Sequence, residues 1–152
     1  MAVARDNPYG SFNFLVTADR FGDAASVRAG FQEVSGLGME VSVVEYRSGN
    51  ERVNRVRKVP GIYRANDVTL KRGLIGVTDL VDWIKDVRDG AQQARATVTI
   101  QLLDEARTGV VMTWRLTNAF PIKYSVAPLN ARSGTDVAVE ELVLACEDMD
   151  VE

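Results

Sequence analysis

Few residues in this 152-residue chain could carry out catalysis. Histidine is absent, which removes the commonest general base and the commonest metal ligand. The single cysteine, Cys146, follows Leu142 and Leu144 at every second position, so we expect a small buried apolar residue and not a nucleophile. With one cysteine and no histidine, a structural zinc site is not expected. We predict no metal and no cofactor.

The acidic pairs and the glycine-rich segment do not form a catalytic pattern either. Asp104–Glu105 and Glu140–Glu141 are adjacent pairs, and adjacent strand residues point to opposite faces, so neither pair suits acid–base catalysis. We interpret both pairs as solvated surface groups. Residues 35–38 contain two glycines but are followed by a strand pattern, whereas a phosphate site needs a helix N-terminus. A tight turn is favoured there, and the chain is predicted not to be an enzyme.

The most charged stretch runs from Arg47 to Lys58. It leaves three interpretations open, namely a solvated hairpin tip, a nucleic-acid patch or a protein contact. No aromatic residues are interleaved for base stacking, and the net charge of −3 is unlike that of a dedicated nucleic-acid binder. A long loop in a compact domain is usually functional or disordered, which favours a contact. The stretch contains Arg47, Asn50, Glu51, Arg52, Arg55, Arg57 and Lys58.

Alternating apolar and polar residues dominate the rest of the chain and predict strands with one buried face. In residues 110–117, for example, Met112, Trp114 and Leu116 alternate with Thr113 and Arg115. Glycines and a proline at Ser48–Asn50 and Pro60–Gly61 are predicted to mark the ends of a long connection. The predicted strands are 11–17, 31–35, 39–47, 67–72, 97–104, 110–117, 119–125 and 137–146.

One segment, Thr78–Asp89, has helical spacing instead. Leu80, Trp83 and Val87 recur on one face, Thr78 is a plausible N-cap and Gly90 a plausible stop. The predicted fold is therefore mostly β with one α-helix, an antiparallel barrel or sandwich in which the helix near 78–89 packs on the sheet.

The last predicted strand has too many apolar residues for one buried face. Residues 142–146 are consecutively apolar, a pattern that indicates cover on both faces. In a small barrel only one face meets the core, so the second face must meet the helix or another subunit. Leu142 and Leu144 are accordingly predicted to take part in a subunit interface.

Length and composition predict one domain covering residues 1–152, with apolar and charged fractions typical of soluble proteins. The first ten residues lack the apolar core of a signal peptide, and no run approaches the roughly 18 apolar residues of a membrane helix. We expect synthesis in the cytoplasm without a signal peptide and no membrane segment.

Several segments, in order along nearly the whole chain, resemble one known family. They are residues 7–16 (NPYGSFNFLV), 31–41 (FQEVSGLGMEV), 45–50 (EYRSGN), 56–61 (VRKVPG), 68–73 (VTLKRG), Trp114 with 116–124 (LTNAFPIKY), 129–131 (LNA) and 137–147 (VAVEELVLACE). This combination resembles the inner-tube, or tail-tube, protein family of contractile phage tails and extracellular contractile injection systems, which is related to the type VI secretion tube protein.

The resemblance implies a structural subunit that forms hexameric rings stacked around a lumen, with edge strands paired between subunits. It implies a sheath protein, baseplate and tube-terminating proteins as partners, and protein cargo or DNA in the lumen of a phage tail or phage tail-like particle. The loop from Arg47 to Lys58 would reach a neighbouring subunit. A baseplate or tube-initiator paralogue of the same fold, or a small β-barrel ligand-binding module, is the alternative.

Overall fold

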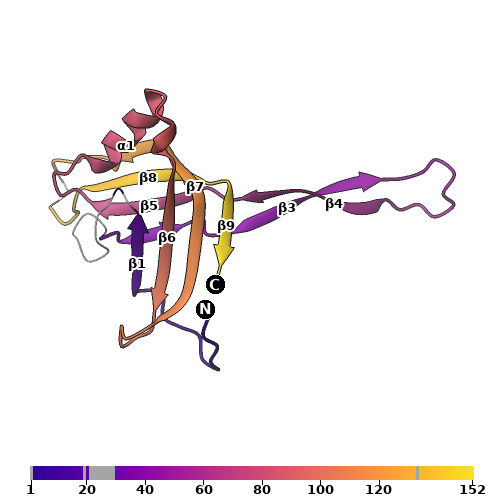
Figure 1. The fold of residues 1–152 in the computed structure, drawn as a ribbon, viewed down its shortest axis with the longest axis horizontal. Helices are drawn as coiled ribbons and strands as arrows, with labels where there is room; N and C mark the ends of the chain where they lie inside the picture. The colour runs from indigo at the N-terminus through magenta and orange to yellow at the C-terminus, as the bar shows by residue number, and fades with distance from the viewer. Residues whose placement is uncertain (1, 19, 21–29, 133) are drawn as a thin grey trace.

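The computed structural model describes residues 2–18, 20, 30–132 and 134–152. Within them, antiparallel strands form one large sheet and one separate two-stranded ribbon (Figure 1). In chain order the elements are β1 (Phe14–Ala18), β2 (Glu33–Ser35), β3 (Met39–Tyr46), β4 (Arg57–Ala65), β5 (Val68–Gly73), α1 (Asp79–Arg88), the 3₁₀ turn η3 (Gln92–Ala94), β6 (Ala96–Leu103), β7 (Val110–Val126), β8 (Val139–Ala145) and β9 (Asp148–Val151). The predicted class, mostly antiparallel β with a single helix, is confirmed.

The large sheet runs in the order β1-β6-β7-β8-β5-β2, with β9 also on β7. Its organising element is β7, where we predicted two strands and the structure has a single one of 17 residues. The first half of β7 pairs with β6 and β9, and the second half pairs with β8. Asn118 adopts a positive φ of 52° between the halves. The sheet therefore wraps around a core, and among the described residues its two ends, β1 and β2, are not paired with each other.

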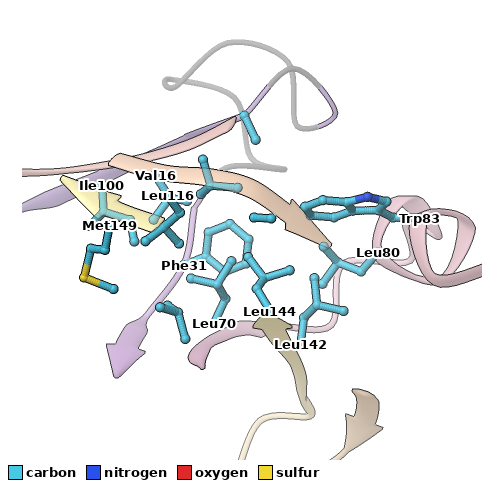
Figure 2. Packing of buried hydrophobic residues seen from close by; sticks show 14 of the residues in the cluster. Val16, Phe31, Leu70, Leu80, Trp83, Ile100, Leu116, Leu142, Leu144 and Met149 are labelled. Carbon is cyan, nitrogen blue, oxygen red and sulfur yellow. The ribbon is translucent and has the colours of Figure 1, made fainter. Parts of the chain in front are cut away.

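The core lies between the curved sheet and α1 (Figure 2). Leu70, Leu116, Leu142 and Leu144 of the sheet and Leu80 and Trp83 of the helix are fully buried together. The Trp83 indole donates a hydrogen bond of 2.5 Å from Nε1 to the Ala94 carbonyl of η3, so burying the ring leaves no unpaired donor.

The helix forms where its pattern predicted. Thr78 precedes it and Asp79 and Asp82 fall in its first turn, where negative charge suits the helix dipole. The Thr78 hydroxyl makes no cap to the backbone and instead lies 3.2 Å from Asp82 Oδ2. Gly90 has a φ of 81°. Glycine adopts this left-handed conformation, which commonly ends helices, without the steric strain of other residues.

The predicted long connection from Ser48 to Gly61 is wrong, because Arg57–Ala65 forms β4 and leaves only residues 47–56 to join it to β3. Pro60 and Gly61 lie inside the strand at a bulge, where Val43 opposes Pro60 and Val41 opposes Tyr63. Proline is tolerated there because a two-stranded ribbon has free edges. The short charged strand β9 was also missed.

Candidate assembly surface

The β3–β4 hairpin, residues 39–65, projects from the body as a long ribbon and is called the arm below (Figure 1). Every residue of β3 is exposed. Val43 is 60% exposed and Ile62 78%. A lone two-stranded hairpin is marginally stable in water, and a large exposed apolar surface marks an interaction site.

The apolar side chains of the arm lie on both faces of the ribbon. Met39, Val41 and Val43 alternate with Val44 and Tyr46 along β3, and alternate strand residues point to opposite faces. Across the ribbon Val44 faces Val59, and oppositely charged residues face each other as Glu40–Arg64 and Glu45–Lys58. Both faces of the ribbon therefore carry exposed apolar side chains.

The tip of the arm is basic and contains most of the predicted interface residues. Residues 47–58 hold five basic residues and one acidic residue, a net charge of +4, so the other 140 residues, with 13 basic and 20 acidic, carry −7. Arg47 donates to the Glu51 carbonyl at 3.1 Å. Arg57 Nε lies 3.1 Å from Glu51 Oε1, without the alignment of a hydrogen bond. The exposed members of the predicted set are Arg47, Asn50, Arg52, Arg55, Arg57 and Lys58, and Glu51 is partly buried.

The root of the arm is fixed to the body by short contacts. Gly36 has a φ of 85°, and a Cβ there would lie 2.1 Å from the Asp67 carbonyl oxygen, so only glycine fits. Asn66 N donates to the Gly38 carbonyl at 3.0 Å. Tyr63 donates from its hydroxyl to Asp148 Oδ1 of β9 at 3.1 Å. Desolvation, followed by this hydrogen bond to a carboxylate, raises the pKa of Tyr63.

Leu142 and Leu144 lie in the subunit's own core with no exposed surface. The intervening Val143 is half-buried on the opposite face of β8. The apolar run is thus covered on one face by the core that includes α1, and it is Val143 that remains accessible to a second subunit. The two leucines are therefore not retained as contact residues, because a fully buried side chain offers no area to a partner.

A buried ionic cluster joins β5, β8, β7 and α1. Arg72 and Glu140 face each other across β5 and β8, are both 1% exposed, and are hydrogen-bonded from Arg72 Nε to Glu140 Oε1 at 2.5 Å. Arg72 also donates to Asp79 at the start of α1. Burial alone would lower the pKa of Arg72, but the hydrogen bonds to the Asp79 and Glu140 carboxylates outweigh it and raise this pKa.

The interpretation of Glu140 as a surface carboxylate is therefore wrong. Its other oxygen accepts a hydrogen bond of 2.7 Å from the Tyr124 hydroxyl. Burial and this hydrogen bond raise the pKa of Tyr124 to about 12. The available signal was alternation, because Arg72 and Glu140 both continue the apolar phase of their strands and so had to point inward.

No group of three or more Asp, Glu or Cys side chains suited to holding a metal occurs in the part of the chain that the structure describes. Burial, followed by the charges of Asp67 and Asp148, raises the pKa of the Cys146 thiol, which keeps it in the less reactive neutral form. Within the described residues, no helix combines the length and apolar character needed to cross a bilayer.

A family model decides the relationship of the chain to known proteins. The model described as T4-like virus tail tube protein gp19 matches residues 10–150. The chain belongs to this tail tube family. The resemblance predicted from the sequence is thus confirmed. No curated protein sequence is a significant match.

Several solved structures are similar to this tail tube protein over most of its length. A chain of an extracellular contractile injection system, described as a PVC sheath-tube complex in the extended state, is 31% identical with a TM-score of 0.78, over 95% of this chain and 91% of that chain. A chain of the anti-feeding prophage baseplate, six-fold symmetrised, is 27% identical with a TM-score of 0.79, over 97% of each chain. Hcp1 from Flavobacterium johnsoniae shares the fold at 12% identity with a TM-score of 0.53, over 91% of this chain and 93% of that one.

Proposed function

We propose that the chain is a structural subunit of the inner tube of a contractile injection system or contractile phage tail, and that it assembles into hexameric rings stacked around a lumen. The observation that carries the proposal is the arm, an apolar ribbon that is exposed on both faces in the isolated subunit. The chain belongs to the tail tube family and resembles a chain of a six-fold symmetrised baseplate. Both findings support an assembly in which neighbouring subunits would cover the arm.

The role is mechanical and not catalytic, and the whole chain, residues 1–152, acts as one domain. The interface residues in this proposal are those of the arm tip, Arg47, Asn50, Glu51, Arg52, Arg55, Arg57 and Lys58. A sheath protein, a baseplate and a tube-terminating protein are the proposed partners, because similar structures come from sheath-tube, baseplate and sheath/tube terminator assemblies. Protein cargo or DNA would occupy the lumen of the assembled particle.

The test is electron microscopy and sedimentation of the purified protein over a range of concentrations. We expect six-fold rings that stack into tubes as the concentration rises. A chain that stays monomeric at every concentration, and also with its sheath and baseplate proteins, would contradict the proposal.

A tube-initiator or baseplate paralogue is the second candidate, because the likeness to the baseplate chain, with a TM-score of 0.79, is as strong as that to the sheath-tube chain. The same preparations separate the two roles. A main tube subunit forms tubes of many rings by itself, whereas an initiator stops at one ring and needs another protein to continue.

Removing the arm tip tests the proposed contact residues. Deletion of Asn50 to Val56, joined by two glycines, shortens the connection between β3 and β4 without touching the body of the subunit. We expect a folded subunit by circular dichroism that no longer stacks. Tubes of normal length from this variant would rule out the tip as an interface.

A further inference from the structure

The large sheet consists of two half-sheets that meet at a corner. β1, β6, β9 and the first half of β7 form one half-sheet, and β2, β5, β8 and the second half of β7 form the other. Figure 1 shows β1, β6 and β9 running across the direction of β5 and β8. Within the described residues, β7 is the one strand that continues from the first half-sheet into the second. The corner is therefore made by a bend in β7, as is usual where a strand passes between sheets.

The strands bend or end along one line of residues, which is called the crease below. The crease consists of Asn66–Asp67, Arg95, Asn118 and Cys146–Glu147. β7 bends at Asn118, whose φ of 52° is uncommon for a residue other than glycine. β8 ends before Cys146 and β9 begins after Glu147, and Cys146 Sγ lies 3.9 Å from the carbonyl oxygen of Asn66, which follows β4. The interruptions therefore lie side by side, and residues at the ends of elements are those that absorb the backbone changes of a hinge.

Glu147 ties the crease together on its outer face. Its Oε2 accepts a hydrogen bond of 2.8 Å from Asn118 Nδ2, and its Oε1 accepts one of 2.5 Å from Arg95 Nη1, just before β6. The bonds from Asn118 and Arg95 lower the pKa of Glu147. Arg95 also lies 5.0 Å from the centre of the Phe120 ring, beyond the bend in β7. Arg95, Asn118 and Glu147 are all exposed, so this tie lies on the side of the sheet away from the core.

A groove of about 440 Å³ lies in the angle between the half-sheets. Phe14, Ile100 and Trp114 line it from the first half-sheet, and Val34 and Leu37 line it from β2 and the turn that follows. In the described residues β1 and β2, the two end strands, are not paired with each other, so no backbone ladder fixes the angle on this side. A change of angle at the crease would therefore narrow or widen the groove, and narrowing it would remove apolar surface from water.

The position of the tie decides which movement it opposes. Closing the angle between the half-sheets sharpens the bend at the crease, and a sharper bend moves groups on its outer face apart. Glu147 would then separate from Arg95 and Asn118, so the tie opposes closure. Exposed ion pairs contribute little to stability, and a tie of this kind can therefore be broken and remade in the folded protein.

We propose that the crease is a hinge between the two half-sheets, that its closure buries the groove, and that Glu147 is a positioning residue that holds the hinge open. The subunit then has two arrangements of the same half-sheets, and the balance between them depends on the bonds that Glu147 makes on the outer face. The open arrangement keeps the apolar groove accessible, and the closed one hides it from water. The inference concerns a single subunit and does not depend on the proposed function.

Spin labels at the two ends of β7 test the hinge directly. In a Cys146→Ala background, Val110→Cys and Val126→Cys place labels at the first and last residues of this strand, both of which are exposed. An excess of unlabelled protein keeps labelled subunits apart, so that the distance between labels, measured by double electron–electron resonance, reports the bend within one subunit. Adding Glu147→Ala should shift this distance to shorter values.

A second variant and a matched control accompany this measurement. Asn118→Gly removes the other end of the tie while keeping a residue that adopts a positive φ without strain, and it should shorten the distance as Glu147→Ala does. Glu152→Ala removes an exposed carboxylate that accepts a hydrogen bond of 2.9 Å from Arg115, away from the crease. That control should leave the distance unchanged.

The two tryptophans give a readout that needs no labels. Trp83 is fully buried, whereas Trp114 lines the groove and is partly exposed. Acrylamide quenching therefore reports mainly on Trp114, and it should be weaker in Glu147→Ala than in the unaltered protein because the closed groove excludes the quencher.

The outcomes bear on the hinge and not on ring formation. Distances that are unchanged in both Glu147→Ala and Asn118→Gly would show that the crease is a fixed bend and overturn the proposal. Longer distances, or stronger quenching of Trp114, would overturn the role of Glu147 in opposing closure. An equal shift in Glu152→Ala would show that loss of any carboxylate has this effect, and would overturn it as well.

Discussion

Arg72 carries its charge into the interior, and the structure shows why that is tolerated. Its guanidinium is shared between Glu140 of β8 and Asp79 of α1, so helix and sheet are tied by hydrogen bonds as well as by apolar packing. Such a cluster is costly to desolvate and is stable only while each member keeps its partners. It fixes where α1 begins on the sheet.

Replacing Arg72 with methionine should therefore strongly destabilise the subunit. The change leaves the buried Glu140 and the partly buried Asp79 without their cation, and we expect the free energy of unfolding to fall by about 3–5 kcal/mol. The free energy of unfolding is measured by urea unfolding, with Arg72→Met introduced into the variant that lacks residues 50–56. Arg88→Met, which removes an exposed arginine paired with Asp89, is the control and should change stability by about 0.5 kcal/mol or less. Equal effects would contradict a structural role for the cluster.

Tyr124 gives a prediction about pH. Its pKa is raised to about 12, so the folded state holds the phenol proton more tightly than the unfolded chain, in which a tyrosine has a pKa of 10.0. The contribution to stability is full below about pH 10 and is lost as the pH rises through about 12. Absorbance at 295 nm should show a late transition that Tyr124→Phe removes. A late transition that persists unchanged in the Tyr124→Phe variant would contradict this assignment.

At the scale of elements, the sequence predicted strands well wherever one face of the strand is buried. Alternation located β5, β6, β7 and β8 because their inward residues, such as Val68 and Leu70 of β5, meet one core. It missed β4, in which exposed apolar residues surround Pro60 and Gly61 and only the last residue, Ala65, joins the core. It missed β9 because only Met149 of that strand is buried, between two exposed aspartates.

The bulge in the arm makes Gly61 a sensitive position. A Cβ there would lie 2.4 Å from Ser42 Oγ and 3.1 Å from the Ser42 carbonyl oxygen, while Ile62 N donates to Ser42 Oγ at 2.8 Å. Gly61→Val should displace this hydrogen bond and redirect the outer half of the arm. Because the arm packs little on the body, we expect unfolding of the subunit to change by about 1 kcal/mol or less and ring formation to be largely lost.

The matched control is Gly49→Val at the tip, where nothing lies within 4 Å of an added Cβ. That variant should keep its rings, as judged by sedimentation and microscopy. Rings from Gly61→Val at the wild-type yield would show that the course of the arm beyond the bulge is unimportant for assembly.

At the scale of the whole molecule, the sequence predicted the family and the fold class but not how the strands are ordered in the sheet. Period-2 patterning assigns a residue to a face without saying which strands adjoin. Phe14, Val34 and Trp114 are far apart in the chain but line one groove, because β1 and β2 form the two ends of the sheet and are not paired with each other in the described residues. No local pattern marks such a place. The separation of a basic segment, residues 47–58, from an acidic remainder is, by contrast, visible in the sequence.

The separation of a basic tip from an acidic body should make assembly sensitive to salt. Attraction between opposite charges speeds encounter and orients the partners, and salt screens it over a Debye length that falls from about 10 Å at 0.1 M to ~3 Å at 1 M. At moderate concentration, salt does not strengthen apolar contacts enough to offset this loss of electrostatic attraction. We therefore expect the rate of ring formation, followed by light scattering, to drop about tenfold between low and high salt.

The double change Arg52→Ala and Arg55→Ala separates the tip from net charge as the cause. It should slow assembly at low salt and flatten the salt dependence, because the attraction that salt screens is already weakened. Lys85→Ala with Arg88→Ala removes two exposed cations from α1, changes the net charge equally and should keep the wild-type salt dependence. If both double variants respond to salt alike, overall charge governs assembly and the tip has no special part in it. If only the tip variant loses its response, the basic residues at the end of the arm steer one subunit onto the acidic body of the next.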